Sequence, residues 1–377
     1  MKNLFNKNHL LTNKILYVLE LEKIINRFDT KIETYGQYTH SYRKFVVDLL
    51  DEYLNEVLGA SNLYGTLEAY YVNEHDFKAD LQKIVLGLTK TVNHYFQKSS
   101  IDGNALALLK GVINDTKLFY SHSIPIRTNQ LFFRLRPVKE EDSQRVFSRK
   151  ELFHIPFEDR GFASTNRYSL TGYPCLYLAN STFVAWEEMR KNSKKYACSL
   201  FVNQIPLRFV ELDATPFNYR TYDNDNSKYD DLIDYALLFP LIVACSLKVR
   251  EHQDNHKFKS EYVIPQLLLE SLRGEFYGIR YRSTRIPDFT EQCWNFAIPP
   301  KDIMDSGYCI TLKRMFLMSE VNVFDFADPL NIKTDSDRFE NQDVYSVLID
   351  KNRVDFKDTI FAEIEHELNQ SHKTIDF

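Results

Sequence analysis

The sequence predicts an α+β protein in which a helical bundle precedes a mixed β-sheet. Two observations carry this prediction. Apolar residues recur at helical spacing through residues 1–125, and no strand-like alternation interrupts them. From residue 126 onward, short strands and helices follow one another without the repeated strand–helix–strand rhythm of a doubly wound sheet. We therefore divide the chain into a helical N-terminal domain, residues 1–125, and an α/β domain with a C-terminal extension, residues 126–377.

Four stretches of the N-terminal domain have the spacing of amphipathic helices. In the first of them, Leu11, Ile15 and Leu19 lie four positions apart, and similar patterns recur over 45–58, 77–96 and 104–113. A long amphipathic bundle of this kind suits dimerisation, partner sensing or autoinhibition. We expect homo-oligomerisation through this domain.

Shorter elements make up the second domain. Its apolar and aromatic runs predict strands at 131–135, 173–179, 194–203, 207–213, 277–284 and 308–318. Helices are expected at 182–189, 229–247, 262–274 and 357–369. The polar run 221–231 predicts a loop, and Pro125 and Pro137 are expected to bracket the first strand.

Composition and motifs exclude several classes of function. A net charge of -5 gives no electrostatic reason to expect nucleic acid or an anionic membrane as the partner. The five cysteines are widely spaced and form no CxxC, so we expect a reducing cytoplasm and neither a disulfide framework nor a zinc ribbon. We expect no signal peptide in residues 1–23, and the longest apolar run, 236–245, is too short to cross a bilayer. The phosphate-binding, dinucleotide-binding and hydrolase glycine motifs are missing, and no pair of histidines has metal-ligand spacing with a carboxylate.

Arg134, His154 and Ser283 are polar residues that the sequence singles out. Arg134 lies in the strand LFFRLRP on the same face as Arg136, and an arginine on an apolar strand needs an anion, either a core carboxylate or a ligand. His154, in ELFHIPFEDR, is either a structural or a catalytic histidine. Ser283 ends a strand, a position typical of a turn residue, and no His or Lys stands next to it in the sequence to imply a nucleophile.

The stretch RYSLTGYPCLYLANSTFVAWEEM places two adjacent acids on a helix that otherwise offers apolar residues to a core. Asn180 or Ser181 can cap this helix. Glu187 and Glu188 are both candidates for a site, and their spacing alone does not choose between them.

Three segments together resemble the RES family, which is named for its characteristic Arg, Glu and Ser. They are FFRLR, then HIPFEDR with RYSLTGYPCLYLANSTFVAWEE, then YVIPQLLLESLRG with GIRYRS, and they cover roughly residues 131 to 320. The resemblance implies an ADP-ribosyltransferase-like fold and cleavage of the nicotinamide–ribose bond of NAD. NAD is then the substrate, inorganic phosphate is a co-substrate if the reaction is phosphorolysis, and no metal is needed. Hydrolysis, mono-ADP-ribosylation of a protein and a catalytically idle binding module stay open as alternatives.

The resemblance also implies a role for each matching residue. Glu188 would stabilise positive charge on the ribose, and Glu187 would lie at the surface or behind the site. Arg134 and Arg167 would bind the pyrophosphate, although Arg167 stands in NRYS, without the glycine that the family has there. Tyr177 would stack on the nicotinamide or pack against its ribose. Ser283 would hydrogen-bond the nicotinamide-side ribose or a phosphate.

Many RES proteins are the toxin half of bacterial toxin–antitoxin pairs, so the resemblance implies an antitoxin or regulatory protein as a partner. Some longer members carry helical domains that resemble the HEPN class of nucleases. Here Arg27, His40 and Arg43 do not have the Arg–His spacing of that class, and we expect no ribonuclease activity.

Overall fold

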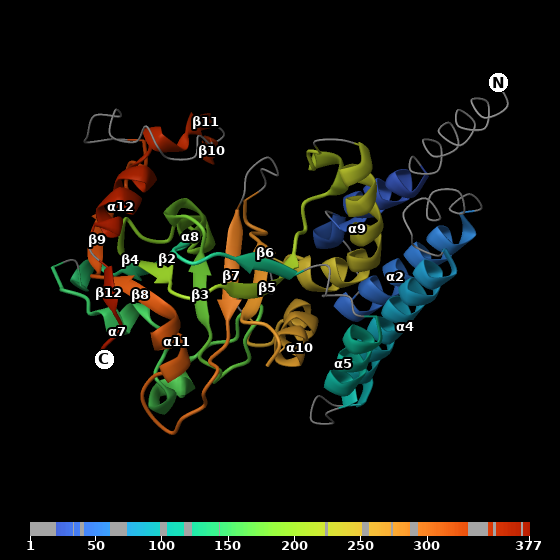
Figure 1. Cartoon of the computed structure of the whole chain (residues 1–377), viewed down its shortest axis with the longest axis horizontal. Helices are drawn as coiled ribbons and strands as arrows, with labels where there is room; N and C mark the ends of the chain where they lie inside the picture. The colour runs from blue at the N-terminus through green and yellow to red at the C-terminus, as the bar shows by residue number, and fades with distance from the viewer. Residues whose placement is uncertain are drawn as a thin grey trace. The chain divides into compact units, whose positions relative to one another are not determined.

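A computed structural model of the chain describes most of its residues. These are 20–32, 34–37, 41–60, 74–98, 104–116, 123–142, 144–222, 225–250, 256–272, 274–286, 293–330, 346–349, 352–370 and 372–377. Contacts within the chain divide it into two compact units (Figure 1). The first comprises Met1–His122 and Ala214–Ser271, and the second comprises Ser123–Asp213 and Leu272–Phe377.

The described residues of the first unit form helices and the connections between them. Residues 20–32 are helical, and α2, for example, begins at a Ser41 cap and buries Phe45, Leu49 and Tyr53 on one side. The three expected helical stretches that begin at residues 45, 77 and 104 are confirmed, whereas the expected positions 11, 15 and 19 lie outside the described residues. The labelled helices of this unit are α2 (Tyr42–Gly59), α4 (Glu74–Lys98), α5 (Asn104–Thr116), α9 (Asp225–Ser246) and α10 (Val263–Ser271).

The helices α9 and α10 belong with the N-terminal helices, whereas the expected division at residue 125 placed them in the second domain. Buried hydroxyl groups connect the two segments. Tyr42 Oη donates to the carbonyl oxygen of Ala244 and Tyr53 Oη to that of Ala236, both over 2.8 Å. These bonds satisfy the polar ends of two buried tyrosine rings. The helical unit is therefore assembled from two separate segments of the chain.

The second unit is built on one ten-stranded mixed sheet. The strand order is β1-β5-β6-β7-β3-β2-β4-β8-β12, with β9 also paired to β4. Only the β5–β6 pair is parallel among the described strand pairs. The α+β prediction and the mixed sheet are thus confirmed. The strands are β1 (Ser123–Ile126), β2 (Leu131–Val138), β3 (Leu176–Ala179), β4 (Lys195–Asn203), β5 (Leu207–Leu212), β6 (Gly278–Arg282), β7 (Trp294–Ile298), β8 (Phe316–Ser319), β9 (Asn322–Asp325) and β12 (His372–Thr374).

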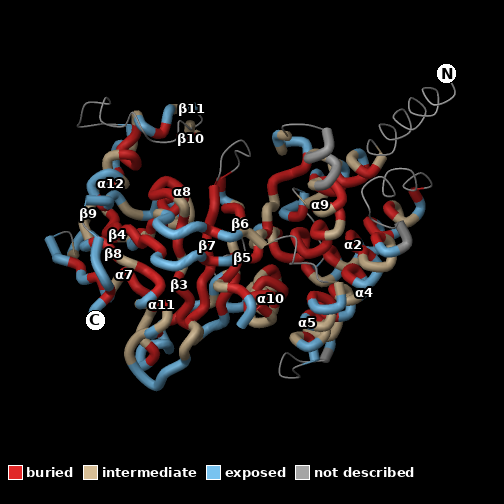
Figure 2. Tube along the Cα trace, in the orientation of Figure 1, coloured by how far each residue is buried: buried red, intermediate tan, exposed pale blue. Residues whose placement is uncertain are grey.

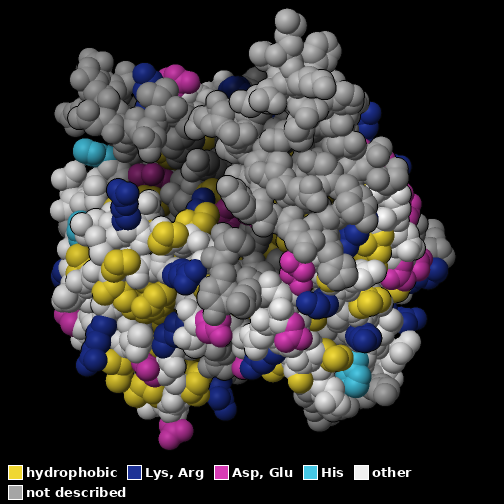
Figure 3. Space-filling model, turned by 45° about the vertical axis from the view of Figure 1, so that its right-hand side comes forward, with side chains coloured by type: hydrophobic (Ala, Val, Ile, Leu, Met, Phe, Trp, Pro, Cys, Tyr) yellow, Lys and Arg dark blue, Asp and Glu magenta, His cyan; other side chains and the backbone are white. Residues whose placement is uncertain are grey.

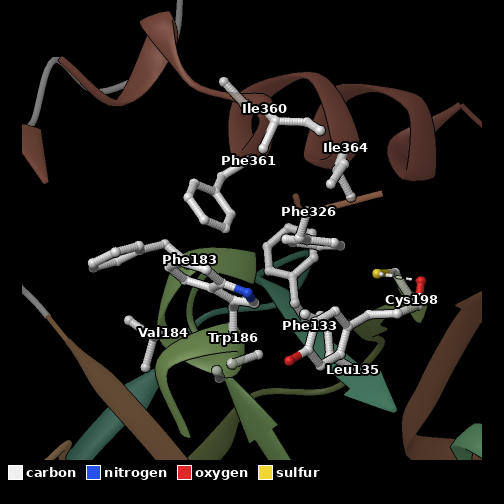
Figure 4. Close-up of a cluster of buried hydrophobic side chains, with 14 of the residues drawn as sticks. Phe133, Leu135, Phe183, Val184, Trp186, Cys198, Phe326, Ile360, Phe361 and Ile364 are labelled. Carbon is white, nitrogen blue, oxygen red and sulfur yellow. Dashed lines mark hydrogen bonds between the residues drawn. The ribbon is translucent and has the colours of Figure 1, made fainter. Parts of the chain in front are cut away.

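Short helices cover both faces of this sheet. Strand β2 shows the alternation that produces two cores, since Phe133 packs with the helices α8 (Thr182–Glu188) and α12 (Ile360–Asn369). Phe132 packs on the opposite face, with α7 (Arg149–Leu152) and α11 (Ile310–Met315). Figure 2 shows the central strands as largely buried, and Figure 4 shows the cluster that α8 and α12 share with β2. We call these the α8/α12 face and the α7/α11 face.

Three expectations for local structure were wrong. The polar run 221–231 is not a loop throughout, because α9 already begins at Asp225. The segment 308–318 is not one strand: α11 occupies most of it, and β8 begins at Phe316. Pro125 and Pro137 lie within β1 and β2 instead of bracketing them. Strand β1 is an edge strand, where the missing N–H of a proline is tolerated.

The C-terminal segment adds α12, which confirms the helix expected at its end, and a two-stranded sheet of β10 (Ser346–Ile349) and β11 (Asn352–Asp355). Of the helices described, none has the length and apolar character needed to span a membrane. On the face shown in Figure 3, acidic and basic side chains are interspersed.

Candidate active site

Glu188 is the last residue of α8, and both ends of this short helix are held firmly. Ser181 caps the first turn, because its Oγ accepts a 3.2 Å hydrogen bond from the Val184 N–H. Asn180 does not cap the helix; its N–H and side-chain oxygen exchange two 2.9 Å hydrogen bonds with the backbone of Trp294 in β7. Helix α8 therefore starts from a point fixed on the sheet.

The helix stops directly after the acids. Arg190 and Lys191 have φ angles of 60° and 52°, a region that residues other than glycine enter infrequently. Two such residues in succession cannot continue a right-handed helix. Lys191 is held there by a 3.0 Å ion pair with Glu187 and by the ring of Trp186, whose centroid lies 4.4 Å from its ammonium nitrogen.

The two adjacent acids differ in their partners. The Glu187 side chain is 16% exposed and pairs with Lys191 behind the helix. The Glu188 side chain is 25% exposed and reaches across to β6 and β7. The structure thus separates two residues that the sequence spacing left equivalent.

Three donors hold the Glu188 carboxylate. Ser283 Oγ donates to Oε1 over 2.6 Å, and Asn295 Nδ2 donates to the same oxygen over 2.8 Å. Arg285 Nε donates to Oε2 over 3.2 Å, from a side chain that is 34% exposed. Because Ser283 and Asn295 are almost fully buried, one carboxylate oxygen is fixed by the protein interior and the other is paired near solvent.

The backbone of β6 and β7 sets the positions of these donors. The Ser283 N–H donates to the carbonyl oxygen of Cys293 over 2.9 Å, and Asn295 lies opposite Tyr281 in the β6–β7 ladder. The Arg285 N–H donates to Ser283 Oγ over 3.2 Å, so the hydroxyl accepts one hydrogen bond while it donates another to Glu188. The hydroxyl proton is thereby directed at the acid.

Tyr177 and the loop of Arg167 lie on neighbouring elements. Tyr177 Oη donates to Ser169 Oγ over 2.9 Å, and the ring of Tyr168 lies 4.6 Å from that of Tyr281. Residues 166 and 169 form a bridge, which places Arg167 in the tight turn between them. Burial raises the pKa of the Tyr177 phenol well above its ordinary value, so the phenol stays neutral at physiological pH.

Arg134 lies where β2 and β3 separate. These strands pair only at Phe133–Ala179 among the described residues, whereas β2 pairs with β4 along its whole length. Phe133 and Leu135 point to the α8/α12 face, so alternation directs Arg134 to the other side of β2. Its Nη1 is buried and has no hydrogen-bond partner among the described residues. Burial lowers the pKa of its guanidinium to about 10, and it stays a cation at neutral pH.

His154 occupies a structural position. It is fully buried, and its Nε2 accepts a 2.9 Å hydrogen bond from the Cys309 N–H. Nδ1 must then carry the proton and donate to the Ile155 carbonyl oxygen over 2.7 Å. Burial lowers the pKa of this imidazole to about 4. The structural interpretation of His154 is the one that these contacts support.

The structure brings Glu188 and Ser283 into direct contact, and Tyr177 beside the loop of Arg167. It does not join Glu188 to Arg134, because the hydrogen bonds of Glu188 go to three other residues. Asn295 and Arg285 were missed as site residues. The only signal for Asn295 was one amide in the apolar strand WNFAI. No group of three or more His, Cys, Asp and Glu residues that could hold a metal occurs in the described part of the chain.

Comparisons with known proteins give one relative. No family model matches the chain, so the RES resemblance rests on the motif residues. No solved structure matches it either. The chain is 34% identical over 227 residues to "Putative toxin YopC" of Bacillus subtilis (strain 168), an alignment that covers 55% of this chain and 49% of that protein. The chain therefore spans about half the length of the curated relative that it matches.

Proposed function

We propose that this protein is an NAD-degrading enzyme that cleaves the nicotinamide–ribose bond and acts as a toxin. The contact between Glu188 and Ser283 carries the proposal. These are two of the three residues for which the RES family is named, and they meet at 2.6 Å from segments 95 residues apart. The relative named as a toxin supports the biological role, and the motif residues support the chemistry.

The proposed reaction needs no general acid. The nicotinamide nitrogen of NAD is already cationic, so when its bond to C1 of the ribose breaks, the electron pair neutralises that nitrogen. Positive charge then develops on the ribose, and water or phosphate forms the new bond at C1. Water would release its extra proton to the solvent.

Glu188 is suited to stabilise that developing charge. Two buried donors fix one of its oxygens, so the carboxylate needs little reorganisation when the charge appears. The other oxygen is paired with Arg285, a partly exposed side chain that the cationic nicotinamide riboside end of NAD would replace. Preorganised groups of this kind are commonly worth about 3 kcal/mol of transition-state stabilisation.

Arg134 points away from the α8/α12 face, so it would supply a donor for the pyrophosphate at the place where β2 and β3 separate. A buried guanidinium nitrogen without a partner is costly in the free protein, and an anion would compensate it. Arg167, in the turn beside Tyr177, would bind the same group, and the neutral phenol of Tyr177 would pack against nicotinamide or its ribose. An antitoxin or regulatory partner, and homo-oligomerisation through the helical unit, belong to the same proposal.

Incubation of the purified chain with NAD, with and without inorganic phosphate, tests the proposal by mass analysis of the products. Free ADP-ribose indicates hydrolysis, and ADP-ribose-1″-phosphate that forms only with phosphate indicates phosphorolysis. ADP-ribose attached to protein would instead favour mono-ADP-ribosylation. A chain that neither binds nor consumes NAD would overturn the proposal in favour of a binding module.

A further inference from the structure

The C-terminal helix α12 lies outside the segments that resemble the RES family, yet it packs directly on the helix that carries Glu188. The ring centroid of Phe361 lies 5.4 Å from that of Phe183 and 5.3 Å from that of Trp186. Ile364 belongs to the same buried cluster, as Figure 4 shows. Much of α8 is therefore covered by a segment to which neither the sequence nor the proposed function gave a role.

Glu365 of α12 binds the first residue of α8 through two hydrogen bonds. Its Oε1 accepts from the Thr182 N–H over 2.6 Å and from the Thr182 hydroxyl over 2.9 Å. Thr182 is fully buried, so water cannot replace these bonds. The first N–H groups of a helix have no partner within the helix. Glu365 satisfies one of them, and Ser181 satisfies another through Val184.

Because α8 is short, the position of Thr182 at its first residue determines the position of Glu188 at its last. The helix has seven residues, with Thr182 first and Glu188 last, so about 9 Å of rigid backbone separates them. At its far end Glu188 must meet Ser283 and Asn295, which belong to the sheet. A shift of the helix along its axis would therefore change the distances at the carboxylate directly.

We propose that Glu365 is a positioning residue of the active site, which fixes Thr182 and thereby places Glu188 against Ser283 and Asn295. This role rests on the proposed function of Glu188. It also gives the C-terminal segment a purpose, because α12 completes the catalytic unit from outside the motif region.

The protonation state of Glu365 decides which substitution keeps its hydrogen-bond acceptor. Burial raises the pKa of its carboxyl to about 8, against which the hydrogen bonds from Thr182 act in the opposite direction. At neutral pH the group is thus largely protonated and accepts through a carbonyl oxygen, a state that glutamine reproduces. Glu365→Gln keeps the acceptor, whereas Glu365→Ala removes it.

The test measures kcat and KM for NAD loss together with hydrogen exchange of α8 in the full chain. We expect Glu365→Ala to lower kcat about 10- to 100-fold with KM within about twofold, since small misplacements of a catalytic group have effects of this size. Glu365→Gln should restore most of kcat. The matched control is Glu367→Ala on the same helix, whose carboxylate accepts from Asn322 over 3.0 Å, and it should behave as the parent.

Hydrogen exchange separates this inference from the proposed function. In Glu365→Ala the amides of α8 should exchange faster than in the parent, whether or not NAD is consumed. A parent chain that consumes no NAD overturns the proposed function, and unchanged exchange of α8 in Glu365→Ala overturns the positioning role. A folded Glu365→Ala with the kcat of the parent, or a Glu365→Gln as impaired as Glu365→Ala, overturns it as well. Thr182→Val is the second variant if Glu365→Ala does not fold. It removes the hydroxyl donor and keeps the N–H. An unchanged kcat in Thr182→Val would then overturn the positioning role.

Discussion

Ser283 donates its hydroxyl proton to Glu188 over 2.6 Å, and this contact follows from the strand order of the sheet. Strand β7 lies between β3, which leads into α8, and β6, which ends immediately before Ser283. Strands β3 and β6 both pair with β7, and their C-terminal ends lie at the same end of it. Helix α8 starts at that end, and Ser283 follows β6 there. The topology brings the two residues together across 95 positions of the chain.

Glu188→Gln is expected to abolish NAD loss without destabilising the chain. The amide oxygen can still accept from Ser283 and Asn295, but the negative charge opposite the ribose is removed. We expect a fall in kcat of at least about 100-fold, with a melting temperature close to that of the parent. The assay is NAD consumption, with thermal unfolding measured on the same samples.

Glu187→Gln is the control for this substitution. It removes an acid from the same helix and breaks the ion pair with Lys191, whereas the carboxylate that Ser283, Asn295 and Arg285 bind is that of Glu188. NAD consumption should persist. The opposite result, loss in Glu187→Gln and retention in Glu188→Gln, would show that the wrong acid had been chosen.

Asn295→Asp is expected to lower kcat for NAD loss more than removal of the Asn295 side chain does. It places a second carboxyl group at the position of an amide that now lies 2.8 Å from Glu188 Oε1. An amide donor is thereby replaced by an acid that repels the Glu188 carboxylate, so Glu188 should leave its position against Ser283. The measurement is kcat and KM for NAD loss at neutral pH.

The control is Asn295→Ala, which loses the same hydrogen bond without adding a charge. Its kcat should fall less than that of Asn295→Asp. Equal kcat values in the two variants would mean that repulsion of the Glu188 carboxylate has no effect on the rate.

Local features of the fold were predictable from the sequence. Helix α8 has its apolar residues and its cap within a few positions, and it was placed within one residue. Helix α11 was not, because TLKRM lies between Tyr308 and Phe316 in a run that resembles a strand. The group that binds its first turn is the Asp302 carboxylate, which accepts from the Thr311 N–H over 2.7 Å. Such a partner is invisible to periodicity.

The candidate site was predictable only where motif residues exist. Glu188 and Ser283 came from the family resemblance, whereas Asn295 has its role through a contact 107 positions away. The grouping of α9 with the N-terminal helices depends on contacts such as that between Tyr53 and Ala236, which are 183 positions apart. Neither composition nor local periodicity predicts contacts between residues so far apart in the sequence.

Arg134→Met is expected to stabilise the chain while it abolishes NAD binding. Methionine fills part of the same volume without burying a charge, and Nη1 of Arg134 has no hydrogen-bond partner among the described residues. We expect the free energy of unfolding to rise by about 1 to 3 kcal/mol. Urea unfolding measures this, and calorimetry with NAD in a Glu188→Gln background measures binding without turnover.

Arg134→Lys separates charge from geometry at the same position. Lysine keeps the positive charge but lacks the planar fork that binds a pyrophosphate with two parallel hydrogen bonds. NAD affinity should fall strongly. Affinity equal to that of the parent would rule out a role of Arg134 in binding the pyrophosphate.

His154 should make the second unit less stable in acid. Its pKa is lowered from 6.5 to about 4 by burial, so between these values the unfolded chain takes up a proton that the folded chain does not. The free energy of unfolding therefore falls as pH falls, by at most about 1.4 kcal/mol for each pH unit from this group. His154→Gln, which can still accept from the Cys309 N–H, should reduce that slope.

Tryptophan fluorescence reports this unfolding selectively. Both tryptophans of the chain, Trp186 and Trp294, lie in the second unit. Urea titrations at pH 7 and pH 5 on the parent and His154→Gln give the slope. An equal pH dependence in the two proteins would show that folding does not lower the pKa of His154.

Glu365 should give the opposite pH dependence from His154 within the same unit. Burial raises its pKa from 4.5 to about 8, so between these values the unfolded chain releases a proton that the folded chain keeps. The free energy of unfolding therefore falls as pH rises through this window. Glu365→Gln cannot ionise, and its stability advantage over the parent should grow between pH 5 and pH 8 in the same fluorescence titrations. Parallel pH profiles of the two proteins would mean that Glu365 ionises as easily in the fold as in the unfolded chain. A glutamine at position 365 would therefore bind Thr182 without the loss of folding free energy that the ionisation of Glu365 causes at alkaline pH.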